Sequence, residues 1–175
     1  MTPIKEGDEV RPILFIDVDG PLNPYAAPPH RRPEGYQTFR FFANTPGNGW
    51  GKRGLRVWLN PEHGKQLLAL PFDLVWGTTW EAMANDHIGP AIGLPALPYV
   101  RFGFTESTKI PALVRFAAGR PFAWVDDEIE TSDHAYVIRE HAGSSLLHFV
   151  SPRLGLLPAD FDVLREWATN GKDAQ

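Results

Sequence analysis

PILFIDVDG, residues 12–20, joins an uninterrupted apolar run to two aspartates and a glycine. An apolar run of this length, bounded by residues that favour turns, is typical of a strand buried on both faces. Successive side chains of a strand point in opposite directions, so the carboxylates of Asp17 and Asp19 would converge on one side. The segment therefore predicts a buried strand that carries two acidic groups to its carboxyl end.

The rest of the chain alternates between short apolar runs and segments with helical spacing. Strands are predicted at residues 72–76, 121–125 and 146–150, with a weaker signal near 99–102. Helices are predicted at residues 61–70, 80–86, 108–118, 133–141 and 159–168. Residues 23–60 hold Pro, Gly, Asn and Arg around two aromatic pieces and are expected to form a small hairpin flap. Strands that alternate with helices predict an α/β fold with a mostly parallel sheet.

Reactive side chains follow three of the predicted strands. In open parallel sheets, ligands bind beyond the carboxyl ends of the strands. The groups at these ends are Asp17 and Asp19, then Thr78 and Thr79, then Asp126 and Asp127. Carboxylates gathered there would repel one another unless a cation joined them, and Mg²⁺ prefers oxygen ligands of this kind. The sequence therefore predicts one magnesium site at this edge of the sheet.

The same residue types suit phosphoryl transfer. A carboxylate such as Asp17 can attack phosphorus and form an aspartyl-phosphate, which divides one difficult displacement into two easier ones. Asp19 could protonate the leaving oxygen and then deprotonate the attacking water. The Thr78 hydroxyl and the Lys109 ammonium would donate to the phosphoryl oxygens.

Four segments, in their order and strand context, resemble the motifs of the haloacid dehalogenase superfamily of phosphatases and phosphotransferases. Residues 17–22, DVDGPL, resemble the first motif, and residues 75–78, VWGT, resemble the second. Lys109 ahead of a helix resembles the third motif, and residues 122–127, FAWVDD, resemble the fourth. Together the four segments and the first strand span residues 12–127.

The resemblance implies a three-layer, Rossmann-like α/β/α sandwich with strand order 5-4-1-2-3. It implies Asp17 as the nucleophile and Asp19 as the general acid and base. Mg²⁺ would be held by the Asp17 carboxylate, the backbone carbonyl of Asp19, and Asp126 or Asp127. The sequence departs from the family at Pro21, where Thr or Val is usual, and in the short insert before the second motif. That insert implies a single domain over residues 1–175 with a small flap and no large cap, open to bulky substrates.

A closer resemblance is to the phosphatase-like domains associated with multi-enzyme RNA repair proteins. It rests on residues 17–24, DVDGPLNP, on residues 78–81, TTWE, and on residues 124–128, WVDDE. This resemblance implies a polynucleotide end as substrate, as an alternative to a phosphorylated small molecule. Basic residues of the flap region would then meet its phosphates; these are Arg31, Arg32, Arg40, Lys52 and Arg53.

Each motif also has a simpler interpretation. An Asp-x-Asp-Gly segment alone is often a turn, and Asp126 and Asp127 could cap the following helix. Lys109 and the pair formed by Arg31 and Arg32 could be solvated surface residues. Either Thr78 or Thr79 could be the phosphate donor while the other caps a helix. Substrate stacking by Trp50, Trp58 or Trp80 is the minor alternative to core and flap packing of the tryptophans.

Composition excludes several classes of function. The 175 residues include no cysteine, which removes disulfides, zinc-thiolate sites and thiol catalysis and agrees with a cytoplasmic location. No apolar run approaches the roughly 20 residues that cross a bilayer, so neither insertion nor export is expected. With a net charge of -4, the chain does not have the broad positive field that is expected of a protein that binds long nucleic acid. The six histidines show no metal-ligand spacing.

Two other functions compete with a phosphatase. The first is a phosphate or nucleic-acid binding module that keeps the fold without catalysis, although the chain carries every catalytic residue type. The second is cleavage of a carbon–halogen or carbon–phosphorus bond. Asp19 argues against the halogen case, because the family needs no general acid at that position.

Overall fold

A four-stranded sheet forms the centre of the computed structural model, which describes residues 10–42, 50, 53–103 and 107–171. Its strands are β1 (Ile13–Ile16), β4 (Asp73–Trp76), β5 (Phe122–Asp126) and β6 (Ser145–Phe149). Every neighbouring pair is parallel, in the order β4-β1-β5-β6. Because β1 has a partner on each side and all four of its residues are buried, the prediction of a buried strand there is confirmed.

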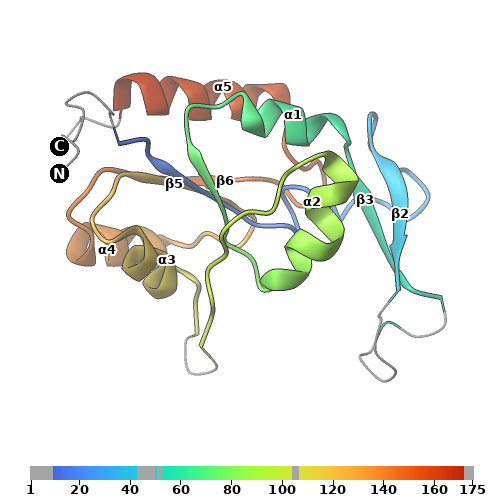
Figure 1. Ribbon diagram of the computed structural model, residues 1–175, viewed down its shortest axis with the longest axis horizontal. Helices are drawn as coiled ribbons and strands as arrows, with labels where there is room; N and C mark the ends of the chain where they lie inside the picture. Colours follow the sequence, from blue (N-terminus) through green and yellow to red (C-terminus); the bar gives the residue numbers. More distant parts are fainter. Residues whose placement is uncertain (1–9, 43–49, 51–52, 104–106, 172–175) are drawn as a thin grey trace, which may run out of the picture.

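Helices cover both faces of this sheet (Figure 1). Leu14 and Ile16 of β1 share a core with residues of α1 (Glu62–Leu68) and α5 (Pro158–Glu166) on one face. Ile13 and Phe15 share a second core with α3 (Ile110–Ala117) and α4 (Thr131–Glu140) on the other. The alternation of side chains along β1 therefore feeds two separate apolar layers. The predicted α/β fold with a mostly parallel sheet is confirmed.

The helix predicted at residues 80–86 has different bounds. After β4 the chain forms a π-helix, η1 (Ala84–Ile88), that continues into the short α2 (Gly89–Ile92). Gly93 ends this helical unit in the left-handed conformation at φ 78°, a position that glycine occupies without a steric penalty. A second π-helix, η2 (Trp167–Gly171), extends α5.

The predicted strand order 5-4-1-2-3 is not matched, because the sheet has four strands and not five. The strand expected at residues 99–102 is reduced to one parallel bridge between Tyr99 and Trp76. Its two hydrogen bonds run from Trp76 N to Pro98 O and from Val100 N to Trp76 O, each 2.9 Å long. Pro98 has no N–H to donate, so the ladder cannot extend backwards from this bridge.

The hairpin expected within residues 23–60 is present as β2 (Gln37–Phe41) and β3 (Leu55–Leu59), an antiparallel pair separate from the main sheet. It stands at one end of the molecule, beside α2 (Figure 1). Asn23 connects it to the loop after β1, because its Oδ1 accepts a 3.1 Å hydrogen bond from Trp58 N. The role of this hairpin as a flap stays a prediction, and Lys52 lies outside the described residues.

Among the helices in the described ranges, none is long and apolar enough to cross a bilayer.

Candidate active site

The carboxyl ends of β1, β4 and β5 meet at one edge of the sheet. Asp17 directly follows β1, Asp126 is the last residue of β5, and Thr78 lies two residues beyond β4. Ladder hydrogen bonds continue past the ends of the strands, from Asp17 N to Val125 O and from Gly77 N to Ile16 O. The strand pairing itself therefore holds these reactive residues side by side.

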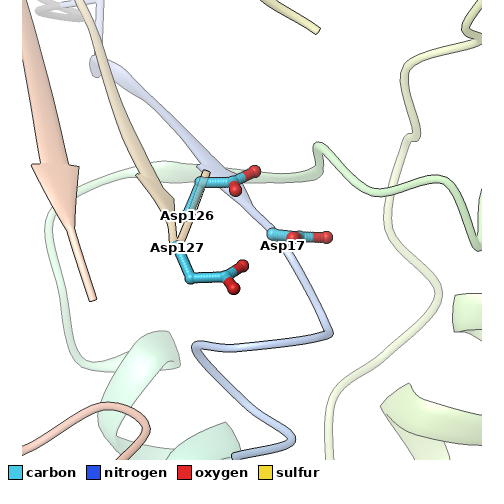
Figure 2. A group of neighbouring side chains, drawn as sticks. All are labelled: Asp17, Asp126 and Asp127. Atoms are coloured by element: carbon cyan, nitrogen blue, oxygen red, sulfur yellow. The ribbon is translucent and has the colours of Figure 1, made fainter. Parts of the chain in front are cut away.

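Three carboxylates converge at this edge. One oxygen each from Asp17, Asp126 and Asp127 lies within 4.8 Å of the other two. Figure 2 shows Asp17 coming from the end of β1 and the other two from the end of β5, with their carboxyl groups brought together. An all-oxygen donor set of this kind suits a hard cation such as Mg²⁺.

Lys109 is the cation that the chain itself supplies to this cluster. It immediately precedes α3, and its Nζ donates to Asp17 Oδ2 at 2.8 Å and to Asp126 Oδ2 at 2.7 Å. Its side chain is 13% exposed, so it is not a solvated surface lysine. Burial alone would lower the pKa of Lys109, but the negative charges of Asp17 and Asp126 outweigh burial and raise it.

One lysine does not balance the buried negative charge. Burial, followed by repulsion from Asp126, raises the pKa of Asp17 to about 7, although Lys109 and a hydrogen bond with Thr78 act in the opposite direction. Burial likewise raises the pKa of Asp126. A divalent cation beside these groups would favour their ionised forms. The residues present therefore fit a metal ion.

Asp126 and Asp127 have different surroundings. Asp126 is fully buried and accepts hydrogen bonds from Trp124 Nε1 at 3.1 Å and from Glu128 N at 2.9 Å. Asp127 is half-buried and accepts a 2.8 Å hydrogen bond from the Tyr25 hydroxyl. Asp126 is thus fixed in place, whereas Asp127 faces more open space.

Gly20 makes the close approach of the β1 loop to Asp127 feasible. It adopts φ +96°, and a Cβ added there would lie 2.5 Å from Asp127 Cγ. Only glycine combines that backbone conformation with that contact at low cost.

Asp19 is positioned by the loop and stands outside the carboxylate cluster. Its Oδ2 accepts from Trp80 Nε1 at 2.9 Å, and its Oδ1 accepts from Asn23 Nδ2 at 2.8 Å. Since Asn23 also holds Trp58 of β3, Asp19 is linked to the hairpin through one side chain.

The two threonines after β4 differ in exposure. Thr78 is buried, bonds to Asp17, and its Oγ1 accepts a 3.3 Å hydrogen bond from Trp80 N. Thr79 is exposed and lines the neighbouring cavity. Thr78 therefore both contacts Asp17 and caps the following turn, whereas which of the two threonines donates to a phosphate stays a prediction.

A cavity of about 580 Å³ opens beside this cluster. We call it the acidic cavity; Lys109 and Asp127 belong to its lining, together with Glu128, Glu130 and Asp133. Its volume falls within the range of small-ligand sites, roughly 300–1,000 Å³. A substrate bound there would lie next to Asp17.

Arg31 and Arg32 are not brought to this cavity. Both are exposed and line a second cavity of about 870 Å³, which also involves Arg153 and His63 and which we call the arginine cavity. Arg32 donates to Thr38 Oγ1 at 3.1 Å. Arg40, on the hairpin, donates to the backbone carbonyl of Arg53 at 3.2 Å. Their predicted contact with substrate phosphates has no support from this geometry.

Sequence reasoning missed the side chains that position the acidic residues: Asn23, Tyr25 and Trp124 as hydrogen-bond partners, and Trp80 as a donor to Asp19. A signal existed for Trp124, which lies two residues before Asp126 on the same strand. The other three act from loops.

Comparison of the chain with protein-family models, with curated proteins and with solved structures finds no match. The resemblance to the haloacid dehalogenase superfamily therefore stays a prediction, based on the four motifs.

Proposed function

We propose that this chain is a magnesium-dependent phosphohydrolase of the haloacid dehalogenase type, which cleaves phosphomonoesters through an aspartyl-phosphate at Asp17. One observation carries the proposal: Asp17 is buried, bonded to Lys109 at 2.8 Å and to Thr78, and next to Asp126 and Asp127. These are the four motif segments gathered around one carboxylate.

In the first step, an oxygen of Asp17 attacks phosphorus and forms a new O–P bond while the ester O–P bond breaks. Lys109 and Thr78 donate to the phosphoryl oxygens and hold them for in-line attack. Asp19 gives its proton to the departing alkoxide, which leaves as an alcohol. In the second step, Asp19 takes a proton from water as that water attacks phosphorus, and phosphate and free Asp17 result.

Asp17, Asp126 and Asp127 would hold Mg²⁺, with the Asp19 backbone carbonyl added by the family resemblance. When bound, the ion supplies positive charge that offsets the negative charge of these carboxylates and of the phosphoryl group. The buried, under-compensated charge of the cluster supports this assignment.

Strand pairing also supports the family. The neighbours of β1 are β4 and β5, the strands that carry the second and fourth motifs.

A test compares the wild-type chain with Asp17→Asn on an aryl phosphate with and without magnesium. We expect magnesium-dependent hydrolysis that the substitution abolishes, while Asp86→Asn, which changes an exposed aspartate of η1, retains it. Full activity of the Asp17→Asn variant would contradict the mechanism.

The hydrogen bonds of Asp19 favour the non-catalytic binding module as a second candidate. Both of its oxygens accept from protein donors, Trp80 and Asn23, which is what a purely structural aspartate would do. Beryllium fluoride, which mimics a phosphoryl group on a carboxylate, separates the two candidates. Magnesium-dependent capture at Asp17 supports the enzyme, and a module that only binds phosphate would show none.

A further inference from the structure

The acidic cavity has a charge that is unusual for a pocket that would receive a phosphate ester. Its acidic lining residues are Asp127, Glu128, Glu130 and Asp133. Among the described lining residues, Lys109 is the one basic side chain, and it is already engaged by Asp17 and Asp126. The lining of the acidic cavity therefore carries net negative charge.

Asp133 gives this cavity a buried oxygen without a donor. The residue is 2% exposed, and its Oδ2 accepts a 2.8 Å hydrogen bond from Glu130 N at the start of α4. Its Oδ1 is buried and has no hydrogen-bond partner among the described residues. Buried carboxylate oxygens are normally satisfied, so Asp133 keeps negative charge that no donor offsets at its Oδ1, next to this cavity.

The remaining walls combine the hydroxyl residues Thr79, Ser107 and Thr108 with three apolar or aromatic side chains. Phe102, Trp124 and Ile129 line the same cavity. The face of an aromatic ring also attracts a cation, by about 0.5–2 kcal/mol, and ammonium groups are bound in this way. Acidic and aromatic lining thus favour the same kind of ligand group.

Resting on the proposed function, we propose that the acidic cavity binds a cationic amine on the leaving group, so that the substrate is a compact amino-alkyl phosphomonoester. The phosphoryl end would meet Lys109 and the metal site, and the ammonium would lie near Glu128 and Asp133. A polynucleotide end would place further phosphates against these carboxylates, and like charges at close range repel. The proposal therefore replaces the polynucleotide with a small zwitterionic ester.

Two nearly isosteric substrates test this directly. Phosphoethanolamine and 2-hydroxyethyl phosphate differ only in an ammonium against a hydroxyl, and a 5′-phosphorylated oligonucleotide supplies the polyanionic case. With the magnesium-loaded chain, we expect kcat/KM for phosphoethanolamine to exceed that for 2-hydroxyethyl phosphate by about tenfold, as a charged hydrogen bond would give. The oligonucleotide should be the poorest of the three.

Variants separate local recognition from general charge. Glu128→Gln should lower the ratio of the two kcat/KM values by about threefold, since Glu128 is exposed and its charge is screened. Glu62→Gln, the same charge change on α1, should leave the ratio unaltered. Asp133→Asn should lower this ratio further. Because Asp133 also caps α4, the Asp133→Asn variant could misfold, and Glu128→Gln then decides the test.

The outcomes distinguish the two proposals. Equal or reversed preference between the small esters, or preference for the oligonucleotide, would overturn the amine site and leave the phosphatase intact. An unchanged ratio in Glu128→Gln and Asp133→Asn would also overturn it. Hydrolysis of none of the three substrates would overturn the amine site, and absence of aryl phosphate hydrolysis as well would overturn both proposals.

Discussion

The acidic cavity and the arginine cavity differ in the charge of their lining residues and in the elements that border them. The first borders Lys109 and the carboxylates at the strand ends, whereas the second lies between the loop after β1 and α5, lined by Arg31, Arg32 and Arg153. Positive charge is what one expects around a phosphate ester, yet it gathers at the cavity without the nucleophile. The difference teaches that strand ends localise chemistry here, and that basic residues close to a motif in sequence do not.

Replacing Asp19, the proposed general acid, should have the largest effect. Asp19→Asn should lower the kcat for an alkyl phosphate by about 10²–10⁴-fold, because an alkoxide needs a proton to leave. The fall for p-nitrophenyl phosphate should be much smaller, since its phenolate leaves unprotonated. The two kcat values measured side by side check this. If kcat fell equally for both substrates, or did not fall, Asp19 would not be the general acid. Its role would then be limited to its hydrogen bonds with Trp80 and Asn23.

Replacing Lys109 should show, through the free energy of unfolding, how much this lysine offsets the buried negative charge of Asp17 and Asp126. Lys109→Met leaves Asp17 and Asp126 without their partner, and breaking a buried pair costs about 3–5 kcal/mol. Urea unfolding without magnesium should show this loss, and magnesium should stabilise the variant more than the wild type. Lys65→Met, at an exposed position of α1, should change neither quantity. An unaffected free energy of unfolding in Lys109→Met would contradict the charge balance described for the site.

At the arginine cavity, we expect an effect on the pH dependence of stability. His63 borders it, and burial lowers the pKa of His63 to about 4 from its ordinary value of 6.5. The unfolded chain takes up this proton as pH falls below 6.5 and the folded chain does not, so stability is full above that pH and declines toward pH 4. Over this range the raised pKa of Asp17 acts in the opposite direction, because folded Asp17 gains a proton as pH falls. Between pH 7 and pH 5 the pH dependence that comes from His63 alone should amount to a loss of about 2 kcal/mol of unfolding free energy.

His63→Gln should remove most of this pH dependence. His134→Gln, at an exposed position of α4, should retain it. Burial also lowers the pKa of His141 and raises the pKa values of Asp17 and Asp126, so the pH dependence due to these three groups stays in both variants. Parallel pH profiles of the two variants would show that His63 is not the titrating group.

The smallest effect is expected where the sequence placed phosphate contacts. Arg31→Ala and Arg32→Ala should each change kcat/KM for a small phosphomonoester by less than about twofold, because exposed charges act weakly beyond a screening length of about 8–10 Å. Steady-state kinetics at physiological salt check this. A tenfold loss of kcat/KM in either variant would indicate that the substrate also contacts the arginine cavity, and would favour a polynucleotide substrate again.

The sequence was sufficient wherever a local pattern decides the structure. The apolar run before Asp17, the hairpin and the start of α3 at Lys109 each follow from neighbouring residues. The meeting of Asp17 and Asp126 follows because parallel strands end at one edge, and Lys109 joins them from the start of α3. These features need no knowledge of how the loops fold.

The remaining features depend on loop conformation and on competition between long-range contacts. Tyr25 reaches Asp127 from a loop 102 positions away, and Trp80 reaches Asp19 across 61 positions. No periodicity encodes such contacts. The strand predicted near residue 99 is reduced to one bridge because Pro98 lacks the N–H that its ladder needs. Arg31 lines the arginine cavity together with residues of α5, and its predicted contact with a phosphate stays a prediction.

Direct detection of the phosphorylated nucleophile tests the central claim. The chain would be mixed with an aryl phosphate and magnesium, quenched in acid within a turnover, digested, and analysed by mass spectrometry of the peptide that contains Asp17. We predict one phosphoryl group on Asp17, absent from Asp17→Asn and accumulating in Asp19→Asn if that variant slows the attack of water. Magnesium-dependent hydrolysis with no phosphoryl group on Asp17 at any quench time would contradict the account.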